Sequence, residues 1–188
     1  MSFDSQYAFN HFYEILQAAP VAVLVTVVSA FLGLFGGMLF CVVRLRRIPV
    51  LNTIVGLLVS LIRSTPILVQ LYVVCYGMPR IVAFVHQNPK FVSNVTIYPN
   101  TVAIVTFTLY ASAYFCEIFR SAYFTVGEGQ RESIKSLNLP AVHAVSRIII
   151  PQAAINAVPN ISNSVIDMLK NTSLLYTISV MDIMARAT

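Results

Sequence analysis

The sequence predicts an all-α fold, a bundle of helices that crosses a lipid bilayer several times. Of the 188 residues, 57% are hydrophobic and only 10% are charged, whereas soluble domains carry about 25% charged residues. The mean hydropathy is +0.78. Residues 18–43 form a run of 26 amino acids without a charge, and a helix needs roughly 20 apolar residues to cross about 30 Å of hydrocarbon. The run is too long for the apolar part of a signal peptide, so we expect a retained membrane span.

The first predicted span, 18–43, is followed by Arg44, Arg46 and Arg47. Because loops rich in Lys and Arg stay in the cytoplasm, these charges place the end of the span inside and the N-terminus outside. A second helical region, 51–78, is interrupted by Arg63 and by Pro66, which removes a backbone hydrogen bond and is expected to kink or break the helix. The polar stretch 79–100 reads as an external loop.

The third predicted span is 101–126, with Glu117 and Arg120 towards its cytoplasmic end. A cytoplasmic loop, 127–147, precedes a fourth helix at 151–169. That helix is unusually polar for a membrane span, and its central Pro159 is accompanied by Gln152, Asn156, Asn160, Ser162, Asn163 and Asp167. Most of the basic residues lie on the side assigned to the cytoplasm, which supports the topology.

The polar loop 127–147 groups several charges between two apolar segments, so it must project into water. Its core, Gln130 to Leu137, contains no Gly or Pro and places Glu132 and Lys135 at i, i+3, which predicts a short helix. Asn138 tolerates the left-handed conformation that ends a helix, and Pro140 is expected to prevent the helix from resuming.

The residues of this loop resemble the EAA loop of ATP-binding-cassette importer membrane subunits. That motif runs Glu-Ala-Ala, three residues, Gly, nine residues, then Ile-x-Leu-Pro, and the spacing is intact here. The matching residues are Glu132-Ser133-Ile134, Asn138 and Ile148-Ile149-Ile150-Pro151; Ser133 and Ile134 replace two Ala, Asn138 replaces Gly and Ile150 replaces Leu. Five flanking blocks narrow the resemblance to the polar amino-acid branch: Arg63-Ser64-Thr65-Pro66 with Gln70, Tyr114 to Arg120, Gly129-Gln130, Pro151-Gln152-Ala153 and Lys170 to Leu174.

The resemblance implies a type I (MetI-like) importer permease fold in a bacterial cell membrane, with about five membrane helices. The last of them either begins within Leu174 to Thr188 or is truncated here. It also implies an amino-acid substrate and three protein partners: a cytoplasmic ATP-binding subunit, a second permease subunit that is identical or different, and an extracytoplasmic solute-binding protein. The short helix would be the coupling helix that docks on the ATPase, through Gly129, Gln130, Glu132, Ser133, Ile134, Leu137 and Asn138.

A polar stripe on the fourth helix is the candidate substrate pathway. Asn160 and Asn163 lie at i−7 and i−4 from Asp167, and a carboxylate in a membrane segment normally faces a cavity or a partner because its insertion costs about 2.5–3.5 kcal/mol. Asp167 could attract an α-ammonium group or form a structural pair with Lys170 or Arg63. Lys170 could bind a substrate carboxylate or mark the outer membrane boundary, and Glu117 could pair with Arg120 or contact substrate. The full predicted pathway set is Asn160, Asn163, Asp167, Lys170, Arg63, Gln70 and Glu117.

The sequence contains no motif of an enzyme. There is no GxxxxGK[ST] phosphate loop, HExxH or GxSxG, and Cys41, Cys75 and Cys116 do not pair at metal-ligand spacing. We therefore expect no cofactor or metal in this chain, with ATP and Mg²⁺ bound by the partner ATPase. Gly33, Gly36 and Gly37 are expected to allow close helix packing. The net charge of +5 is dispersed at span ends and does not indicate nucleic-acid binding.

The main alternative is a secondary amino-acid transporter driven by an ion gradient, with Asp167 or Glu117 as a proton carrier. Such folds have more spans and internal repeats, and the sequence shows neither.

Overall fold

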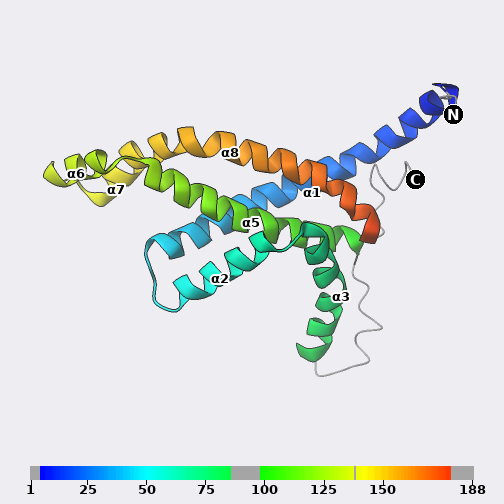
Figure 1. Cartoon of the computed structure of the whole chain (residues 1–188), viewed down its shortest axis with the longest axis horizontal. Coiled ribbons are helices and arrows are strands. Elements are labelled where there is room, and N and C mark those ends of the chain that lie inside the picture. Colours follow the sequence, from blue (N-terminus) through cyan, green and yellow to red (C-terminus); the bar gives the residue numbers. More distant parts are fainter. Residues whose placement is uncertain (1–4, 86–97, 138, 179–188) are drawn as a thin grey trace.

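The computed structural model describes residues 5–85, 98–137 and 139–178, and this part of the chain consists of helices joined by short turns, without a strand. Figure 1 shows a long, narrow bundle. Its elements in chain order are α1 (Ser5–Leu45), α2 (Leu51–Ser64), α3 (Ile67–Val85), α5 (Pro99–Thr125), α6 (Glu128–Ser136), α7 (Ala141–Ala144), the π-helix η1 (Val145–Ile149), α8 (Ile150–Asn171) and the 3-10 helix η2 (Thr172–Ile178).

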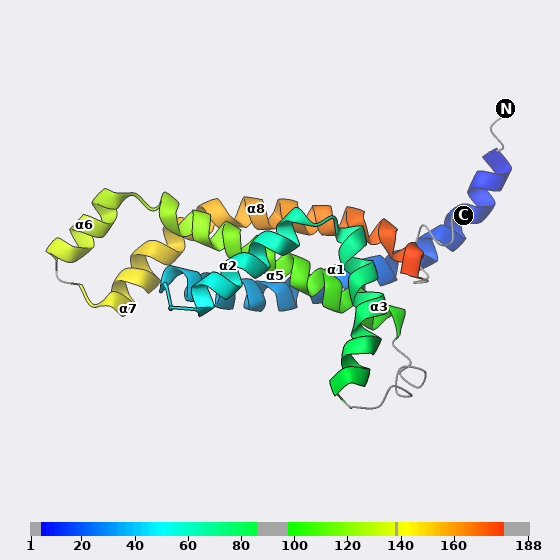
Figure 2. The same cartoon turned by 60° about the horizontal axis from the view of Figure 1, so that its bottom comes forward.

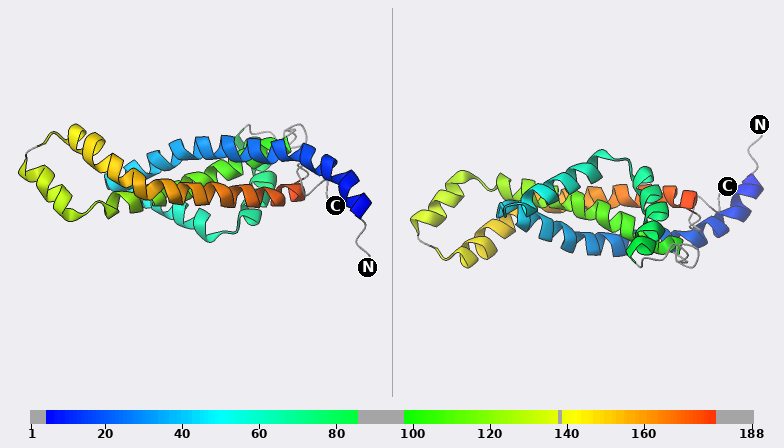
Figure 3. Two further views of the ribbon diagram at one scale, coloured as in Figure 1. Left: turned by 90° about the horizontal axis from the view of Figure 1, so that it is seen from above. Right: turned by 90° about the horizontal axis from the view of Figure 1, so that it is seen from below.

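Helix α5 forms the centre of the bundle. It packs against α1 over most of its length and also contacts α2, α3 and α8, and Figure 3 shows α1, α5 and α8 running side by side. Large apolar side chains of α3, α5, α8 and η2 meet in one core, in which Leu71, Phe107, Phe115, Met168 and Leu175 are completely buried. Helices α6 and α7 project beyond one end of this bundle, as Figure 2 shows, and α1 begins at the other end.

The predicted close packing of the first span is confirmed at the contact between α1 and α5. A Cβ placed on Gly37 would lie 2.7 Å from Cβ of Phe115 and 3.0 Å from the backbone nitrogen of Cys116. Gly33 and Gly36 abut Ala111 and Ser112 of α5 in the same way. Small residues on one helix allow the two backbones to approach closely, and membrane helices gain their packing energy from such contacts.

Two described helices are long and apolar enough to cross a membrane, at Ala19–Leu45 and Pro99–Thr125. A third span results if α2 and α3, which meet at an angle of 114°, are counted as one broken span. Helix α8 does not reach this degree of hydropathy because of its polar stripe. The predicted fifth span lies almost entirely outside the described residues.

The structure corrects the sequence interpretation at two prolines. Pro79 lies inside α3, which continues to Val85 where an external loop was expected. A membrane helix tolerates an interior proline because neighbouring groups satisfy the freed carbonyl.

Pro140 does not keep the chain out of a helix. It precedes α7, and its carbonyl accepts a hydrogen bond from the Ala144 amide at 3.0 Å. Proline suits the start of a helix because the amide it lacks would have no partner there. The second half of the predicted loop is therefore helical and leads through η1 into α8.

Candidate functional site

An open cavity with a volume of about 430 Å³ lies between the end of α2, the second half of α5 and α8. Its lining is polar and includes Arg63 from α2, Glu117 from α5 and Asp167 from α8. The complete lining is Arg63, Tyr114, Glu117, Ile118, Ser121, Asn160, Asn163, Ser164 and Asp167. The structure thus brings together Arg63, Glu117, Asn160, Asn163 and Asp167 of the predicted pathway set, whereas Gln70 and Lys170 do not line the cavity.

Arg63 contributes the cationic group of the cavity. It lies in the last turn of α2, and its guanidinium carbon lies 5.4 Å from the centre of the Tyr114 ring. Tyr114 in turn stacks on Tyr110, with ring centroids 4.3 Å apart. Stacking on an aromatic face orients a guanidinium without neutralising it. Among the described residues Arg63 has no ion-pair partner, so its charge can pair with an anionic group that enters the cavity.

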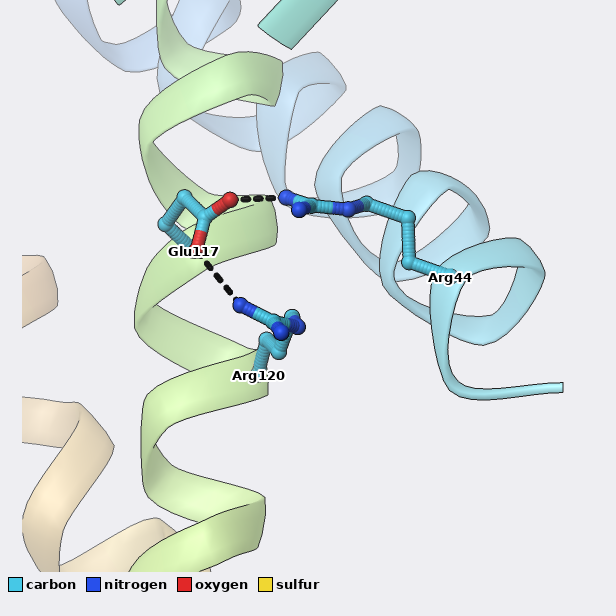
Figure 4. Close-up of polar contacts among 3 residues, drawn as sticks. All are labelled: Arg44, Glu117 and Arg120. Carbon is cyan, nitrogen blue, oxygen red and sulfur yellow. Dashed lines mark hydrogen bonds and ion pairs between the residues drawn. The ribbon is translucent and has the colours of Figure 1, made fainter. Parts of the chain in front are cut away.

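Glu117 is held by two arginines (Figure 4). One carboxylate oxygen accepts a hydrogen bond from Arg44 of α1, and the other lies 3.4 Å from Nη1 of Arg120, one turn further along α5. The Arg44 and Glu117 side chains are 18% and 23% exposed, so the pair is largely withdrawn from water. Through its contact with Arg44, Glu117 ties α1 to α5, and the charges of the two arginines offset its own. The pair with Arg120 was one of the two alternatives that the sequence left open for Glu117, whereas Arg44 was expected only to set the membrane orientation.

Asp167 has a weaker partner. Its carboxylate lies 3.6 Å from the Lys170 ammonium, and both side chains are exposed, at 62% and 73%. An exposed ion pair of this kind contributes only about 0–1 kcal/mol, so the Asp167 carboxylate can exchange Lys170 for another cation. The pairing with Lys170 was one of the alternatives left open by the sequence. Asn160, seven residues before Asp167 on the same stripe, donates its amide to the Asn156 carbonyl at 2.9 Å.

Gln70 lies at the elbow between α2 and α3 and not in the cavity. Its side-chain amide donates to the carbonyls of Ile62 at 2.7 Å and of Thr65 at 2.8 Å. Both acceptors belong to the end of α2. The predicted contact of Gln70 with the pathway is therefore indirect in this structure.

The predicted docking helix is α6, and it lies at the tip of the projection in Figure 1. Gly129, Gln130, Glu132, Ser133 and Leu137 are exposed, and Ile134 is half-buried. Leu137, which directly follows α6, is 70% exposed. Asn138 lies outside the described residues. The helix and the residue that follows it therefore expose both a carboxylate, Glu132, and an apolar side chain, Leu137.

Comparison with known proteins gives concordant relatives. The chain is 34% identical over 183 residues to the probable amino-acid permease protein YxeN of Bacillus subtilis, covering 97% of this chain and 78% of that protein. It is also 34% identical to the L-cystine transport system permease protein TcyL of the same organism, over 89% of this chain and 68% of the relative. The chain is 34% identical to the probable amino-acid ABC transporter permease protein PatM of Vibrio harveyi, over 100% of this chain and 80% of that protein.

Two solved structures share the fold. A structure described as an amino acid ABC transporter with histidines has a TM-score of 0.87 at 24% identity and covers all of this chain and 82% of its own. The MetNI methionine ABC transporter in an inward-facing conformation has a TM-score of 0.63 at 17% identity, over 92% of this chain and 76% of its own. The predicted permease fold is therefore confirmed.

The family model described as "binding-protein-dependent transport system inner membrane component" matches residues 30–188. This match extends from the middle of α1 to the last residue and includes the cavity and α6. The resemblance drawn from the EAA loop and its flanking blocks is confirmed, and the chain belongs to the family of inner membrane components of binding-protein-dependent transport systems.

Proposed function

We propose that this chain is the membrane-spanning subunit of an ATP-driven importer for polar amino acids, in which it forms the translocation pathway and transmits the work of a separate ATPase. The observation that carries the proposal is a helix with polar and apolar groups at the tip of a projection, on a chain that belongs to an importer family. The relatives' names supply the substrate class. The chain itself performs no catalysis in this proposal: ATP and Mg²⁺ are bound by the partner.

In the proposed complex α6 docks in a groove of the ATPase. Glu132 makes the polar contact, because it is exposed and lies in the middle of the helix. Leu137 and Ile134, which lie nearly one turn apart, supply the apolar contact. A stable anchor of this kind combines a buried apolar side chain with a polar rim. When ATP draws two ATPase subunits together, two such helices, one from each permease subunit, move towards each other and the membrane helices open outward.

The cavity is the proposed site through which the amino acid passes after an extracytoplasmic binding protein has delivered it. Arg63 would bind the α-carboxylate, because it has no ion partner among the described residues. Asp167 would bind the α-ammonium group, because its own ion pair is exposed. Asn160, Asn163 and Ser164 would contact the remaining polar atoms. Glu117, which pairs with two arginines, would shape the wall of the pathway.

The proposed orientation places α6 in the cytoplasm and the N-terminus outside. Helix α1 ends at the same end of the bundle from which α6 projects (Figure 1), and it begins at the opposite end. Arg44 lies in the last turn of α1, and Arg46 and Arg47 follow the helix. Concentration of arginines at one end is the pattern of a cytoplasmic surface.

Uptake into membrane vesicles tests the energy source. We expect amino-acid uptake to be inhibited by vanadate, which blocks the ATPase cycle, and to be unaffected by ionophores that dissipate proton and sodium gradients. Uptake that resists vanadate and collapses with the ionophores would refute the proposal in favour of a secondary transporter. Vesicles that lack the binding protein serve as the control for uptake by other routes.

A further inference from the structure

We propose that Gln70 is a positioning residue that holds Arg63 at the wall of the cavity by hydrogen-bonding the end of α2. This inference rests on the role of Arg63 in the proposed function. Gln70 itself does not line the cavity, so it acts through the helix end and not on the substrate.

The position of Arg63 depends on how α2 ends. Arg63 is the last residue but one of α2, and Pro66 lacks the amide that would continue the hydrogen-bond ladder. Thr65 is extended, with φ −100° and ψ 129°, as expected for a residue before proline. The last carbonyls of a helix have no partner within the helix. In a membrane each unsatisfied carbonyl costs several kcal/mol, so the terminal turn keeps its shape only if other donors are supplied.

Side chains supply the donors for the last carbonyls of α2. Ser64 and Thr65 donate to the carbonyl of Leu61 at 3.1 and 2.8 Å. The carbonyls of Ile62 and Thr65 receive the amide of Gln70 instead. Ser64 and Thr65 belong to the end of α2, whereas Gln70 belongs to α3. Among these donors only Gln70 connects the two arms of the 114° elbow.

The side-chain nitrogen of Gln70 donates to two carbonyl oxygens at once. Gln70 nitrogen carries two hydrogens, and it lies 2.7 and 2.8 Å from two carbonyl oxygens. The two acceptors flank Arg63 in sequence, at Ile62 and Thr65. Fixing the carbonyls on both sides fixes the backbone from which the guanidinium projects towards Tyr114. An apolar side chain or a carboxylate of the same length would leave both carbonyls without a donor, and the turn that carries Arg63 would rearrange.

The test uses the complete transport complex, purified with its ATPase and binding protein and reconstituted in proteoliposomes, with transport measured for an amino acid that the wild-type complex takes up. Gln70→Met keeps the length of the side chain without donors, Gln70→Glu keeps its shape without donors, and Gln70→Lys restores donors. Thr65→Val is the matched control, because the Leu61 carbonyl that it affects keeps Ser64 as a partner. Co-purification of the ATPase measures assembly.

We expect Gln70→Met and Gln70→Glu to lower transport by about tenfold, which corresponds to about 1.4 kcal/mol, mainly by raising the half-saturating substrate concentration. Gln70→Lys and Thr65→Val should stay within about threefold of wild type. Basal ATPase activity should not change in any of the four. If Gln70→Met does not assemble, Gln70→Glu carries the comparison. Tenfold loss in Gln70→Lys as well as in Gln70→Met would overturn the role assigned to the donors.

A double-mutant cycle decides whether Gln70 acts through Arg63. In an Arg63→Lys background, which loses the planar guanidinium, Gln70→Met should lower transport by less than about twofold further, because coupled residues are not additive. The same tenfold factor in both backgrounds would refute the proposal while leaving the proposed function intact. Wild-type transport by Arg63→Lys and by Arg63→Ala would instead remove Arg63 from the pathway, and the proposed cavity would fall together with this inference.

Discussion

The ion pair between Arg44 and Glu117 gives the sharpest stability prediction. Exposed ion pairs contribute about 0–1 kcal/mol, and loss of one partner of a fully buried pair costs about 3–5 kcal/mol. The two side chains are 18% and 23% exposed, so Arg44→Gln should cost an intermediate amount, about 2 kcal/mol. Glu117 keeps Arg120 as a partner at 3.4 Å, which limits the loss. For a chain of this size, 1 kcal/mol corresponds to about 2–4 °C, so we expect a decrease in Tm of about 4–8 °C.

The assay is thermal unfolding of the purified protein in detergent micelles, followed by circular dichroism at one scan rate. Arg46→Gln is the matched control, because Arg46 follows α1 at the same end but is exposed, and surface substitutions stay within about 0.5 kcal/mol. A cycle that combines Arg44→Gln with Glu117→Gln should give a coupling energy of about 2 kcal/mol. Equal shifts for Arg44→Gln and Arg46→Gln, or a coupling energy near zero, would refute the assignment of this pair as the tie between α1 and α5.

Three further predictions concern packing, coupling and the pathway. Gly37→Ala should destabilise the protein by about 1–3 kcal/mol, because its Cβ would lie 2.7 Å from Cβ of Phe115 and overpacking at a tight contact has this cost. The control is Gly56→Ala, whose Cβ would meet nothing within 4 Å, and it should leave the melting temperature unchanged or raise it. Glu132→Ala should abolish most of the stimulation of ATPase activity by loaded binding protein without changing basal hydrolysis; wild-type stimulation would exclude a coupling role for that side chain. Asp167→Asn should lower amino-acid uptake at least about tenfold, or 1.4 kcal/mol, with the complex still co-purifying, and unaltered uptake would remove Asp167 from the pathway.

The features that could be predicted from the sequence are those that local chemistry determines. The short helix predicted at Gln130 to Leu137 is α6 at Glu128–Ser136, because a run of helix-forming residues without Gly or Pro favours a helix locally. The break near Pro66 was predicted for the same reason, since the missing amide is a property of proline itself. The stripe of Asn160, Asn163 and Asp167 follows from the helical period and does line the cavity.

The features that could not be predicted depend on which helices become neighbours. Arg44 and Glu117 are 73 positions apart, and no sequence pattern around either residue indicates the other as its partner. The glycines near 33–37 indicated a tight helix contact but not its partner. Gln70 was predicted as a pathway residue from the block it belongs to, and only the angle of the elbow shows that its amide faces the end of α2. Proline specifies that a hydrogen bond is lost, but the identity of the replacement donor depends on how the chain turns afterwards.

Helix α8, predicted as the fourth span, shows how a polar face lowers the hydropathy of a helix that borders a cavity. A helix that faces lipid on all sides is apolar throughout, whereas a helix that borders an aqueous pathway must place polar groups on one face. In this chain Asp167 is 62% exposed, and contact of that carboxylate with hydrocarbon would cost about 2.5–3.5 kcal/mol. Nearby, Ile166 and Leu169 are also exposed. The polar face therefore requires water or a polar partner, while the apolar residues beside it suit lipid or a second subunit. The polar residues that lower the hydropathy of α8 are therefore the same residues that line the proposed path for a zwitterion.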